Sequence, residues 1–300
     1  MSVVIRTDNL TKFYGKNRGV LDLDLEVGQG EIFGFLGPNG AGKTTTIRIL
    51  LDFIRPTRGT AALFGLDSRK NSIETRRRTG YMLADLALYE NMTGADLLRY
   101  FAHLRGGVEW ESVMELAGRL DSDLSQPIRS LSRGNRQKIG LIQAFMHRPD
   151  LLILDEPSSG LDPLMQREFY SMLAEARDEG RTVLLSSHVL PEVERVCDRV
   201  GIIREGRLIT VEHVAHLKER ALRRLEIRFE TQVPEDAFAG VPGISELHVE
   251  NNTVHCAIAG NLDPLIKAIA SFTVVDLISH EPSLEEVFLA YYGADEKDAE

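Results

Sequence analysis

The sequence predicts a large α/β domain followed by a small α+β domain, and two observations carry this expectation. In residues 1–220, short apolar runs alternate with segments of helical periodicity, which is typical of parallel strands joined by crossover helices. Charge is also distributed unevenly, because residues 1–220 contain 30 basic and 30 acidic side chains whereas residues 221–300 contain 5 and 15. This shift predicts a domain boundary near residue 220, and therefore domains at 1–220 and 221–300.

The larger domain opens with strand signals and continues with alternating helices and strands. Apolar and polar residues alternate at 3–6 and 20–27, which predicts two half-buried antiparallel strands. Helical segments in the middle of the domain predict a helical subdomain beside this antiparallel β subdomain. In chain order, the other expected elements are a strand at 31–36, helices at 43–53, 95–104 and 111–120, a strand at 151–154, a helix at 164–178 and a strand at 182–185.

The smaller domain shows a β-α-β-β-α-β order, which predicts a ferredoxin-like fold. A last amphipathic helix is expected at 284–292, and its apolar face serves either subunit association or packing onto its own sheet. The acidity of residues 221–300 is typical of a well-solvated small domain and disfavours binding to nucleic acid or anionic lipid. The expected strands are 224–230, 244–249, 254–259 and 273–278, and the expected helices are 235–239 and 262–270.

The composition indicates a soluble globular protein, with 43% hydrophobic and 27% charged residues. The longest apolar runs span only a few residues, far fewer than the roughly 20 that cross a bilayer. No secretory signal pattern opens the chain, and Cys197 and Cys256 fit a reducing cytosol. We therefore expect a cytoplasmic protein.

Residues 37–44 read GPNGAGKT, which matches the phosphate-binding pattern G-x-x-x-x-G-K-[ST]. In this pattern backbone N–H groups point at phosphate oxygens, the lysine binds the β- and γ-phosphates, and the threonine hydroxyl ligates Mg²⁺. A purely structural glycine-rich turn is the alternative, but the segment follows a predicted strand and opens a predicted helix, as binding requires. The predicted nucleotide-binding residues here are Gly37, Pro38, Asn39, Gly40, Ala41, Gly42, Lys43, Thr44 and Thr45.

Two acidic residues follow the apolar strand at 151–154. A buried strand delivers Asp155 rigidly to the Mg²⁺ shell, so Thr44 and Asp155 form the predicted metal site. Glu156 lies one residue further, where a carboxylate can polarise an attacking water. Many strands end in acidic residues, so the pair alone is a weak signal. The phosphate-binding loop upstream makes it a strong one.

The segment LSRGN at 131–135 opens a helix. Ser132 is a good N-cap, and this structural role is the simplest interpretation. The functional alternative is that the Ser132 hydroxyl and the Gly134 amide face a γ-phosphate at this helix N-terminus.

Taken together, the phosphate loop, LSRGN, LLILDEP, SSGLDP and SSH resemble the ATP-binding cassette ATPases over about residues 3–215. The resemblance implies a P-loop NTPase cassette that binds ATP and Mg²⁺. It also implies a head-to-tail dimer, in which Ser132 and Gly134 of one chain close over ATP held by the other.

Three further residues match family positions, each with an ordinary alternative. Tyr14 matches the aromatic that stacks on adenine, although a strand-end tyrosine needs no such role. Residues 158–162, including Asp162, match a loop that crosses the dimer, although turn chemistry also accounts for them. His188 matches the histidine that contacts the γ-phosphate, although a lone histidine is usually structural. Its place after the strand at 182–185 favours the functional role, so Glu156 and His188 are the predicted catalytic residues.

Two departures from the family pattern are visible. Arg133 and Asn135 stand where the family commonly has LSGGQ, while Ser132 and Gly134 are kept. Ala84 stands near the place of a glutamine that contacts Mg²⁺ and reports to membrane subunits. A methyl group cannot coordinate a cation, so either water or the neighbouring Asp85 takes this place, and we favour water.

Within the family, the chain resembles the stand-alone ATP-binding subunits of prokaryotic drug and antibiotic exporters, through GEIFGFLGPNGAGKTTTIRIL, LIQAFMHRPDLLILDEPSSGLDP and EPSLEEVFLAYYG. This implies an ATPase that powers a separately encoded integral membrane permease. It also implies a homodimer or paired cassette, peripheral on the inner face of the cell membrane, with no nucleic acid partner. The alternatives are a soluble cassette ATPase not tied to transport and a regulatory nucleotide-binding subunit.

Overall fold

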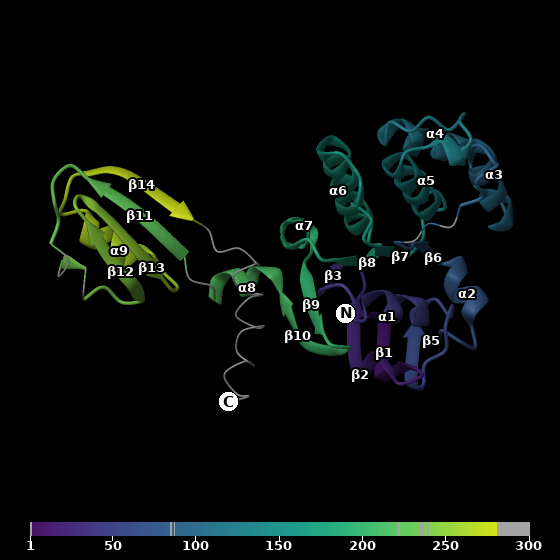
Figure 1. The fold of residues 1–300 in the computed structure, drawn as a ribbon, viewed down its shortest axis with the longest axis horizontal. Coiled ribbons are helices and arrows are strands. Elements are labelled where there is room, and N and C mark those ends of the chain that lie inside the picture. The colour runs from purple at the N-terminus through teal and green to yellow at the C-terminus, as the bar shows by residue number, and fades with distance from the viewer. Residues whose placement is uncertain are drawn as a thin grey trace. The chain divides into compact units, whose positions relative to one another are not determined.

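The computed structural model describes residues 2–84, 86, 88–220, 223–234, 237–238 and 240–280. The chain divides into two compact units, of which the first ends at Glu212 and the second begins at His213. Each unit has a hydrophobic core of its own, and Figure 1 shows the elements of both. Within the described ranges, no helix has the length and apolar character that crossing a membrane demands.

The first unit begins with a four-stranded antiparallel sheet. Strand β1 (Val3–Tyr14) pairs with β2 (Asn17–Gly28) and with β4 (Arg58–Leu63), and β4 pairs with β5 (Leu66–Asp67). The strand order is therefore β2-β1-β4-β5. This sheet is the predicted antiparallel β subdomain.

Strands β1 and β2 extend well beyond the predicted segments 3–6 and 20–27. Their pairing register shifts at several points, and Asn9 and Asp22 adopt positive φ angles of 47° and 45° within these shifts. A bulge interrupts the alternation of apolar and polar residues. The sequence pattern therefore revealed only the regular parts of two long strands.

A second, six-stranded sheet forms the centre of the first unit. Its order is β10-β9-β3-β8-β7-β6, and β9, β3, β8, β7 and β6 run parallel to one another. Strands β3, β7 and β8 are buried along their whole length, which is why they read as continuous apolar runs. The bounds are β3 Ile32–Leu36, β6 Thr79–Met82, β7 Leu151–Asp155, β8 Thr182–Ser187, β9 Arg199–Arg204 and β10 Arg207–His213.

Helix α1 (Lys43–Leu50) lies between the two sheets, in contact with β2, β4 and β7. Its Ile47 and Leu50 are fully buried in a core that both sheets share. The helix that follows the phosphate loop is thus held from two sides, which fixes the position of its N-terminus.

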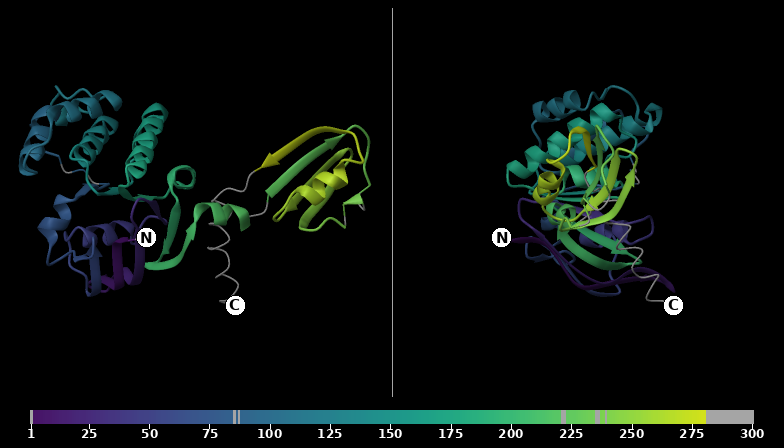
Figure 2. Two further views of the ribbon diagram at one scale, coloured as in Figure 1. Left: turned by 180° about the vertical axis from the view of Figure 1, so that it is seen from behind. Right: turned by 90° about the vertical axis from the view of Figure 1, so that its left-hand side faces the viewer.

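The remaining helices of the first unit surround this centre. The views in Figures 1 and 2 agree that α3, α4 and α5 lie together on the side of the parallel sheet opposite the antiparallel sheet, as the predicted helical subdomain. Arg119 on α4 joins this group to α6 through ion pairs of 2.6 Å with both Glu168 and Glu175. The bounds are α2 Ser72–Arg77, α3 Gly94–Leu104, α4 Trp110–Arg119, the 3₁₀ turn Ile128–Ser130, α5 Arg133–Phe145, α6 Pro163–Asp178 and α7 Leu190–Val196.

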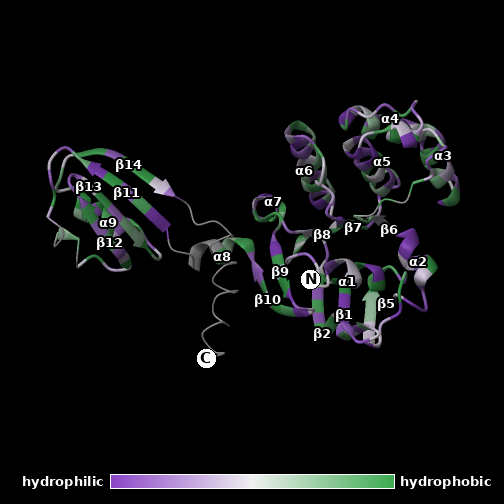
Figure 3. Ribbon diagram, in the orientation of Figure 1, coloured by the Kyte–Doolittle hydropathy of each residue, from purple (hydrophilic) through white to green (hydrophobic). Residues whose placement is uncertain are grey.

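The second unit has a four-stranded antiparallel sheet of order β12-β13-β11-β14. This is the strand order of a ferredoxin-like fold and confirms the predicted fold class. Figure 3 shows the alternation of hydrophobic and hydrophilic residues along β11 that its burial pattern follows. The bounds are α8 Val214–Arg220, β11 Arg223–Phe229, β12 Ile244–Glu250, β13 Thr253–Ile258, α9 Asp263–Ile269 and β14 Val274–His280.

Two predicted helices of the tail fall outside this description. The helix expected at 235–239 lies mostly, and the helix expected at 284–292 entirely, outside the described residues. Asn251 has a positive φ of 56° in the turn between β12 and β13.

Candidate functional site

The phosphate loop connects β3 to α1 at the carboxyl edge of the parallel sheet. Gly42, the N-cap of α1, has a φ of 115°, and a Cβ there would lie 2.8 Å from the carbonyl oxygen of Gly19, so only glycine fits. The first turn of α1 has no acidic residue and no side-chain cap. Its N–H groups and the positive end of its dipole therefore suit a phosphate group.

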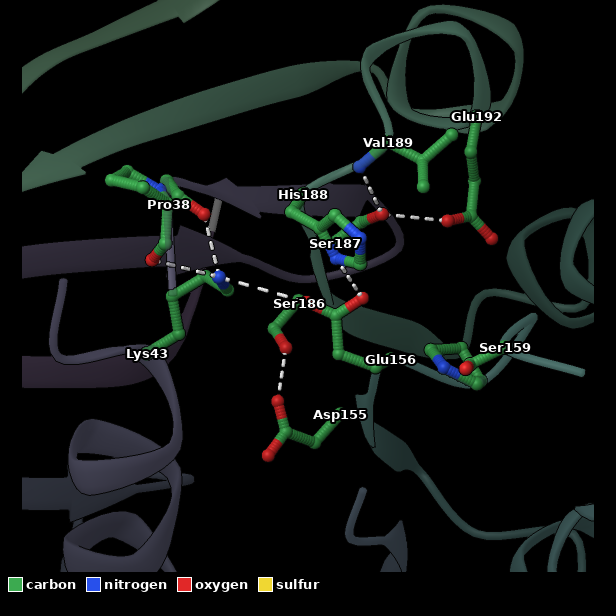
Figure 4. A network of polar contacts seen from close by, with 12 residues as sticks. Pro38, Lys43, Asp155, Glu156, Ser159, Ser186, Ser187, His188, Val189 and Glu192 are labelled. Carbon is green, nitrogen blue, oxygen red and sulfur yellow. Dashed lines mark hydrogen bonds and ion pairs between the residues drawn. The ribbon is translucent and has the colours of Figure 1, made fainter. Parts of the chain in front are cut away.

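The side chain of Lys43 is 6% exposed and turns back over the loop. Its Nζ atom donates to the carbonyl oxygens of Gly37 at 2.6 Å and Pro38 at 3.3 Å (Figure 4). The same atom lies 3.6 Å from Oε1 of Glu156. The lysine thus places a buried positive charge between the loop and the end of β7.

Asp155 and Thr44 meet as the metal prediction requires. The carboxylate of Asp155 is fully buried at the end of β7, and its Oδ2 atom accepts a hydrogen bond of 2.7 Å from the Thr44 hydroxyl. Its Oδ1 atom accepts from the hydroxyl of Ser186 on β8. Carboxylate and hydroxyl oxygens suit Mg²⁺, which commonly takes one or two carboxylates and completes its shell with water and substrate phosphates. Among the residues that the structure describes, no group of three or more His, Cys, Asp or Glu could hold a metal ion.

Glu156 and His188 also meet in the structure. Glu156 adopts a φ of 52°, in the left-handed region, and its amide donates to the carbonyl oxygen of Ser186 at 3.1 Å. Its Oε2 atom lies 2.7 Å from Nδ1 of His188, which follows β8 (Figure 4). The amide of Gln137 on α5 donates to the carbonyl oxygens of Glu156 and Pro157, at 3.1 and 2.9 Å. The strained turn that carries the carboxylate is thus held from two sides.

Tyr14 lies beside the start of α1. It ends β1, its side chain is partly exposed, and its hydroxyl is 3.5 Å from the hydroxyl of Thr45. The ammonium group of Lys12 lies 5.3 Å from the centre of its ring. The ring is therefore adjacent to the phosphate loop, where an adenine base can stack on it.

Ser132 forms the N-cap that the sequence predicted as its simplest role, because its hydroxyl accepts from the amide of Asn135 at 3.2 Å. The segment also packs against the loop at 158–162 of the same chain. A Cβ at Gly134 would lie 2.6 Å from the carbonyl oxygen of Gly160, so this close approach requires glycine. The guanidinium of Arg133, a departure from the family pattern, donates to the Ser159 hydroxyl at 2.9 Å.

Asp162 caps α6. Its Oδ1 atom accepts from the amides of Met165 and Leu164, both at 3.0 Å. These backbone N–H groups stabilise the carboxylate and hold the pKa of Asp162 below its usual range. Turn chemistry therefore accounts for the conformation of this loop, and Asp162 remains exposed at the surface.

The departure at Ala84 lies just beyond the end of β6. Ala84 is exposed and its methyl group offers no ligand. Asp85, the alternative ligand, lies outside the described residues.

Three residues of the site were not assigned roles from the sequence. Ser186 and Ser187 stand in the SSH motif, and their hydroxyl groups bond to Asp155 and Glu192. Gln137 stands three residues after Gly134, within a helix whose buried face gives no sign of a polar role. For the serines, the SSH motif offered a signal in the sequence, whereas nothing singled out Gln137. The contacts of all three depend on which strands and helices become neighbours.

Comparisons with known proteins agree with this geometry. The family model described as ABC transporter matches residues 20–159. The bacitracin transport ATP-binding protein BcrA of Bacillus licheniformis is 40% identical over 312 residues, and the alignment covers 98% of each chain. A solved ATP-binding subunit of an ABC transporter matches with a TM-score of 0.66 and 30% identity, covering 72% of this chain and 92% of that one. The dimeric cassette MJ0796 has the same fold, with a TM-score of 0.65 and 19% identity over 70% of this chain and 98% of that one.

These likenesses confirm the resemblance that the motifs predicted. The relative BcrA matches along nearly the whole chain, and the solved subunits match the P-loop cassette fold. The chain belongs to the ABC transporter family, as one of its ATP-binding ATPase subunits.

Proposed function

We propose that the protein hydrolyses ATP to drive a separate membrane permease that exports drug- or antibiotic-like molecules. The observation that carries the hydrolytic role is the placement of Glu156 between His188 and Lys43 of the phosphate loop (Figure 4). Support for the cargo class comes from BcrA, a bacitracin transport protein that is similar along nearly the whole chain. The protein would work on the inner face of the cell membrane, bound to its permease.

Nucleotide binding uses groups that the fold already holds in place. The N-terminal amides of α1 and the ammonium group of Lys43 bind the phosphates, and Tyr14 stacks on the adenine. Thr44 and Asp155 hold Mg²⁺, which neutralises phosphate charge when bound. The methyl group of Ala84 would offer Mg²⁺ no ligand, and we expect water to take that place.

Hydrolysis requires a base and a group that contacts the γ-phosphate. Glu156 accepts a proton from the attacking water. Asp155 is bonded to Thr44 at the proposed metal site, whereas Oε1 of Glu156 has no hydrogen-bond partner among the described residues. His188 fixes the orientation of that carboxylate and contacts the γ-phosphate. Glu156 has a left-handed backbone directly after β7, and its Oε1 atom lies 3.6 Å from Lys43 of the loop.

The proposed dimer places the segment with Ser132 and Gly134 of one chain over the ATP of the other. Ser132 and Asp162 are exposed, so both are available to a second chain. The packing of Gly134 on Gly160 joins the two segments into one rigid surface. The fold neighbour MJ0796 was solved as a dimer, which supports a dimer for this chain.

The permease needs a docking site, and a groove between α2, β6 and α3 suits it. The groove has a volume of about 350 Å³. At its rim Ile73 is 77% exposed and Leu104 is 62% exposed, and clustered exposed apolar residues mark interaction surfaces. The lining residues are Ile73, Arg76, Arg77, Tyr81, Phe101, Leu104, Arg105 and Gln143. We propose that an apolar segment of the permease binds here.

The docking proposal is tested by adding charge to the groove. Ile73→Asp combined with Leu104→Asp is expected to abolish stimulation of the ATPase by the co-purified permease, while the basal rate stays unchanged. Met114→Asp is the matched control, because Met114 is also exposed, at 49%, but lies on α4 outside the groove. Stimulation that survives the double substitution would reject the groove as the docking site.

The function as a whole is tested by ATP-dependent export. Membrane vesicles that contain the permease and this protein are expected to move bacitracin only with Mg-ATP, and not with the Lys43→Ala variant. ATPase activity without any permease-dependent change would favour a soluble ATPase. Nucleotide binding without turnover would favour a regulatory subunit.

A further inference from the structure

Glu192 on α7 is a buried acid beside the site, and the mechanism proposed above does not use it. Its side chain is only 3% exposed. The hydroxyl of Ser187 donates to its Oε2 atom at 2.7 Å, as Figure 4 shows. Burying a carboxyl group is costly unless its polar atoms are well used. Packing alone therefore does not explain why a glutamate occupies this buried position.

The contacts of Glu192 lead directly to His188. The Ser187 hydroxyl that donates to Glu192 also accepts a hydrogen bond of 3.0 Å from the amide of Val189. Ser187 and Val189 flank His188, whose Nδ1 atom lies 2.7 Å from Glu156. Val189 is the N-cap of α7 and supplies no side-chain cap, so the Ser187 hydroxyl satisfies this helix start in its place. Glu192 thus anchors the turn that presents the histidine.

The same carboxyl group also lies beside a second functional loop. Oε1 of Glu192 is buried and has no hydrogen-bond partner among the described residues. Burial raises the pKa of Glu192, and the hydroxyl groups of Ser187 and Ser158 oppose part of this rise. Ser158, itself 8% exposed, begins the loop at 158–162. Glu192 therefore lies between the turn of His188 and the loop proposed to cross the dimer.

We propose that Glu192 is a positioning residue for hydrolysis. Its carboxyl group holds the Ser187 hydroxyl, and this bond fixes the backbone turn that aims His188 at Glu156. The carboxyl group also lies close to Ser158, so a movement of the loop at 158–162 reaches the histidine through the same group. The proposal rests on the proposed function, because Glu192 acts only through His188.

The substitutions Glu192→Gln and Glu192→Leu separate positioning from packing. Glutamine keeps an oxygen that accepts from Ser187, so Glu192→Gln is expected to retain kcat within about threefold. Glu192→Leu removes the acceptor and is expected to lower kcat about tenfold or more, while KM for ATP changes less than about twofold. Ser187→Ala breaks the same bond without substituting any residue of α7, although it also removes the acceptor of the Val189 amide. It is expected to reproduce the kcat loss, which keeps the test valid if the leucine variant folds poorly.

A double-mutant cycle shows whether Glu192 acts through the histidine. In a His188→Ala background, Glu192→Leu and Ser187→Ala are each expected to change kcat by less than about twofold, because the group they position is gone. Val193→Ala is the matched packing control, because Val193 is fully buried on the same helix and its apolar side chain forms no hydrogen bond with either serine. It is expected to lower the melting temperature and leave kcat unchanged.

Three outcomes would overturn the proposal. Losses that multiply in the His188→Ala background would show that Glu192 acts independently of the histidine. An equal loss of kcat in Val193→Ala would show that any damage to α7 has the same effect. Wild-type turnover of the single variant His188→Ala would remove the histidine from the proposed mechanism. That result would contradict the proposed function itself, and not only the role of Glu192.

Discussion

The Nδ1 atom of His188 lies 2.7 Å from the Oε2 atom of Glu156, although 32 residues separate them in the chain. The contact exists because β7 and β8 are parallel neighbours, so the residues that follow them emerge at the same edge of the sheet. On the other side of the carboxylate, Lys43 lies 3.6 Å away. The carboxylate that we propose as the base for water is thus contacted from two directions.

Glu156→Gln is expected to preserve ATP binding and slow hydrolysis by about a hundredfold or more, because the amide keeps the shape of the side chain but cannot accept a proton. It is also expected to trap an ATP-bound dimer, visible by size-exclusion chromatography. Glu205→Gln, at an exposed glutamate paired with Arg18, is the control. Turnover near the wild-type rate would remove Glu156 from the role of base.

Thr44→Ala and Asp155→Ala are each expected to abolish Mg²⁺-dependent turnover, because each removes one member of the bonded pair proposed to hold the cation. Asp85→Ala is expected to leave the basal rate and its Mg²⁺ dependence nearly unchanged, since water is proposed to fill the place opposite Ala84. The measurement is steady-state ATPase activity against Mg²⁺ concentration. A Mg²⁺ response about tenfold weaker in Asp85→Ala would show that this acid has replaced the missing ligand.

A fragment of residues 1–220 is expected to bind ATP with nearly the affinity of the full chain. Every predicted nucleotide contact precedes residue 220, and the buried cluster of the first unit contains no residue of the second. Equilibrium binding of a fluorescent ATP analogue to both proteins is the measurement. A fragment that is soluble and folded by circular dichroism, yet does not bind, would place the domain boundary elsewhere.

The sequence predicted most of the elements because burial leaves a strong pattern. Strands buried on both faces, such as β3 and β7, read as apolar runs, and the glycines and lysine of the phosphate loop form a specific motif between a strand and a helix. Strand β4 (Arg58–Leu63) was not predicted, because its glycine and its two alanines are residues that strands disfavour. Strands β9 and β10 were also not predicted, although Val200 to Ile203 form a buried apolar run.

The contacts that complete the site could not be read from the sequence. Ser186 reaches Asp155 only because β8 lies between β3 and β7, and this strand order is a tertiary property. Gln137 reaches the backbone of Glu156 from a helix whose neighbours depend on the whole helical subdomain. Motifs predict which residues matter, whereas strand order determines which of them meet.

The last prediction concerns His147, whose side chain lies near Arg105 at the base of the helical subdomain. Burial and the charge of Arg105 lower the pKa of His147 to about 4, from an ordinary value near 6.5. The unfolded chain therefore binds a proton in this pH range that the folded chain does not. The free energy of unfolding is therefore highest above about pH 6.5 and falls as the pH falls toward 4. The loss amounts to about 2 kcal/mol at pH 5.

His147→Gln removes this titration, so its free energy of unfolding should fall less between pH 7.5 and 5 than that of the wild type, by about 2 kcal/mol. Urea unfolding followed by tryptophan fluorescence reports on the first unit, which contains His147, because the single tryptophan, Trp110, lies on α4 of that unit. His103→Gln, at an exposed position on α3, controls for the change of side chain and should keep the wild-type pH dependence. Parallel pH profiles of the wild type and His147→Gln would show that His147 accepts a proton in the folded protein as readily as in the unfolded chain, against the low pKa that its burial beside Arg105 implies.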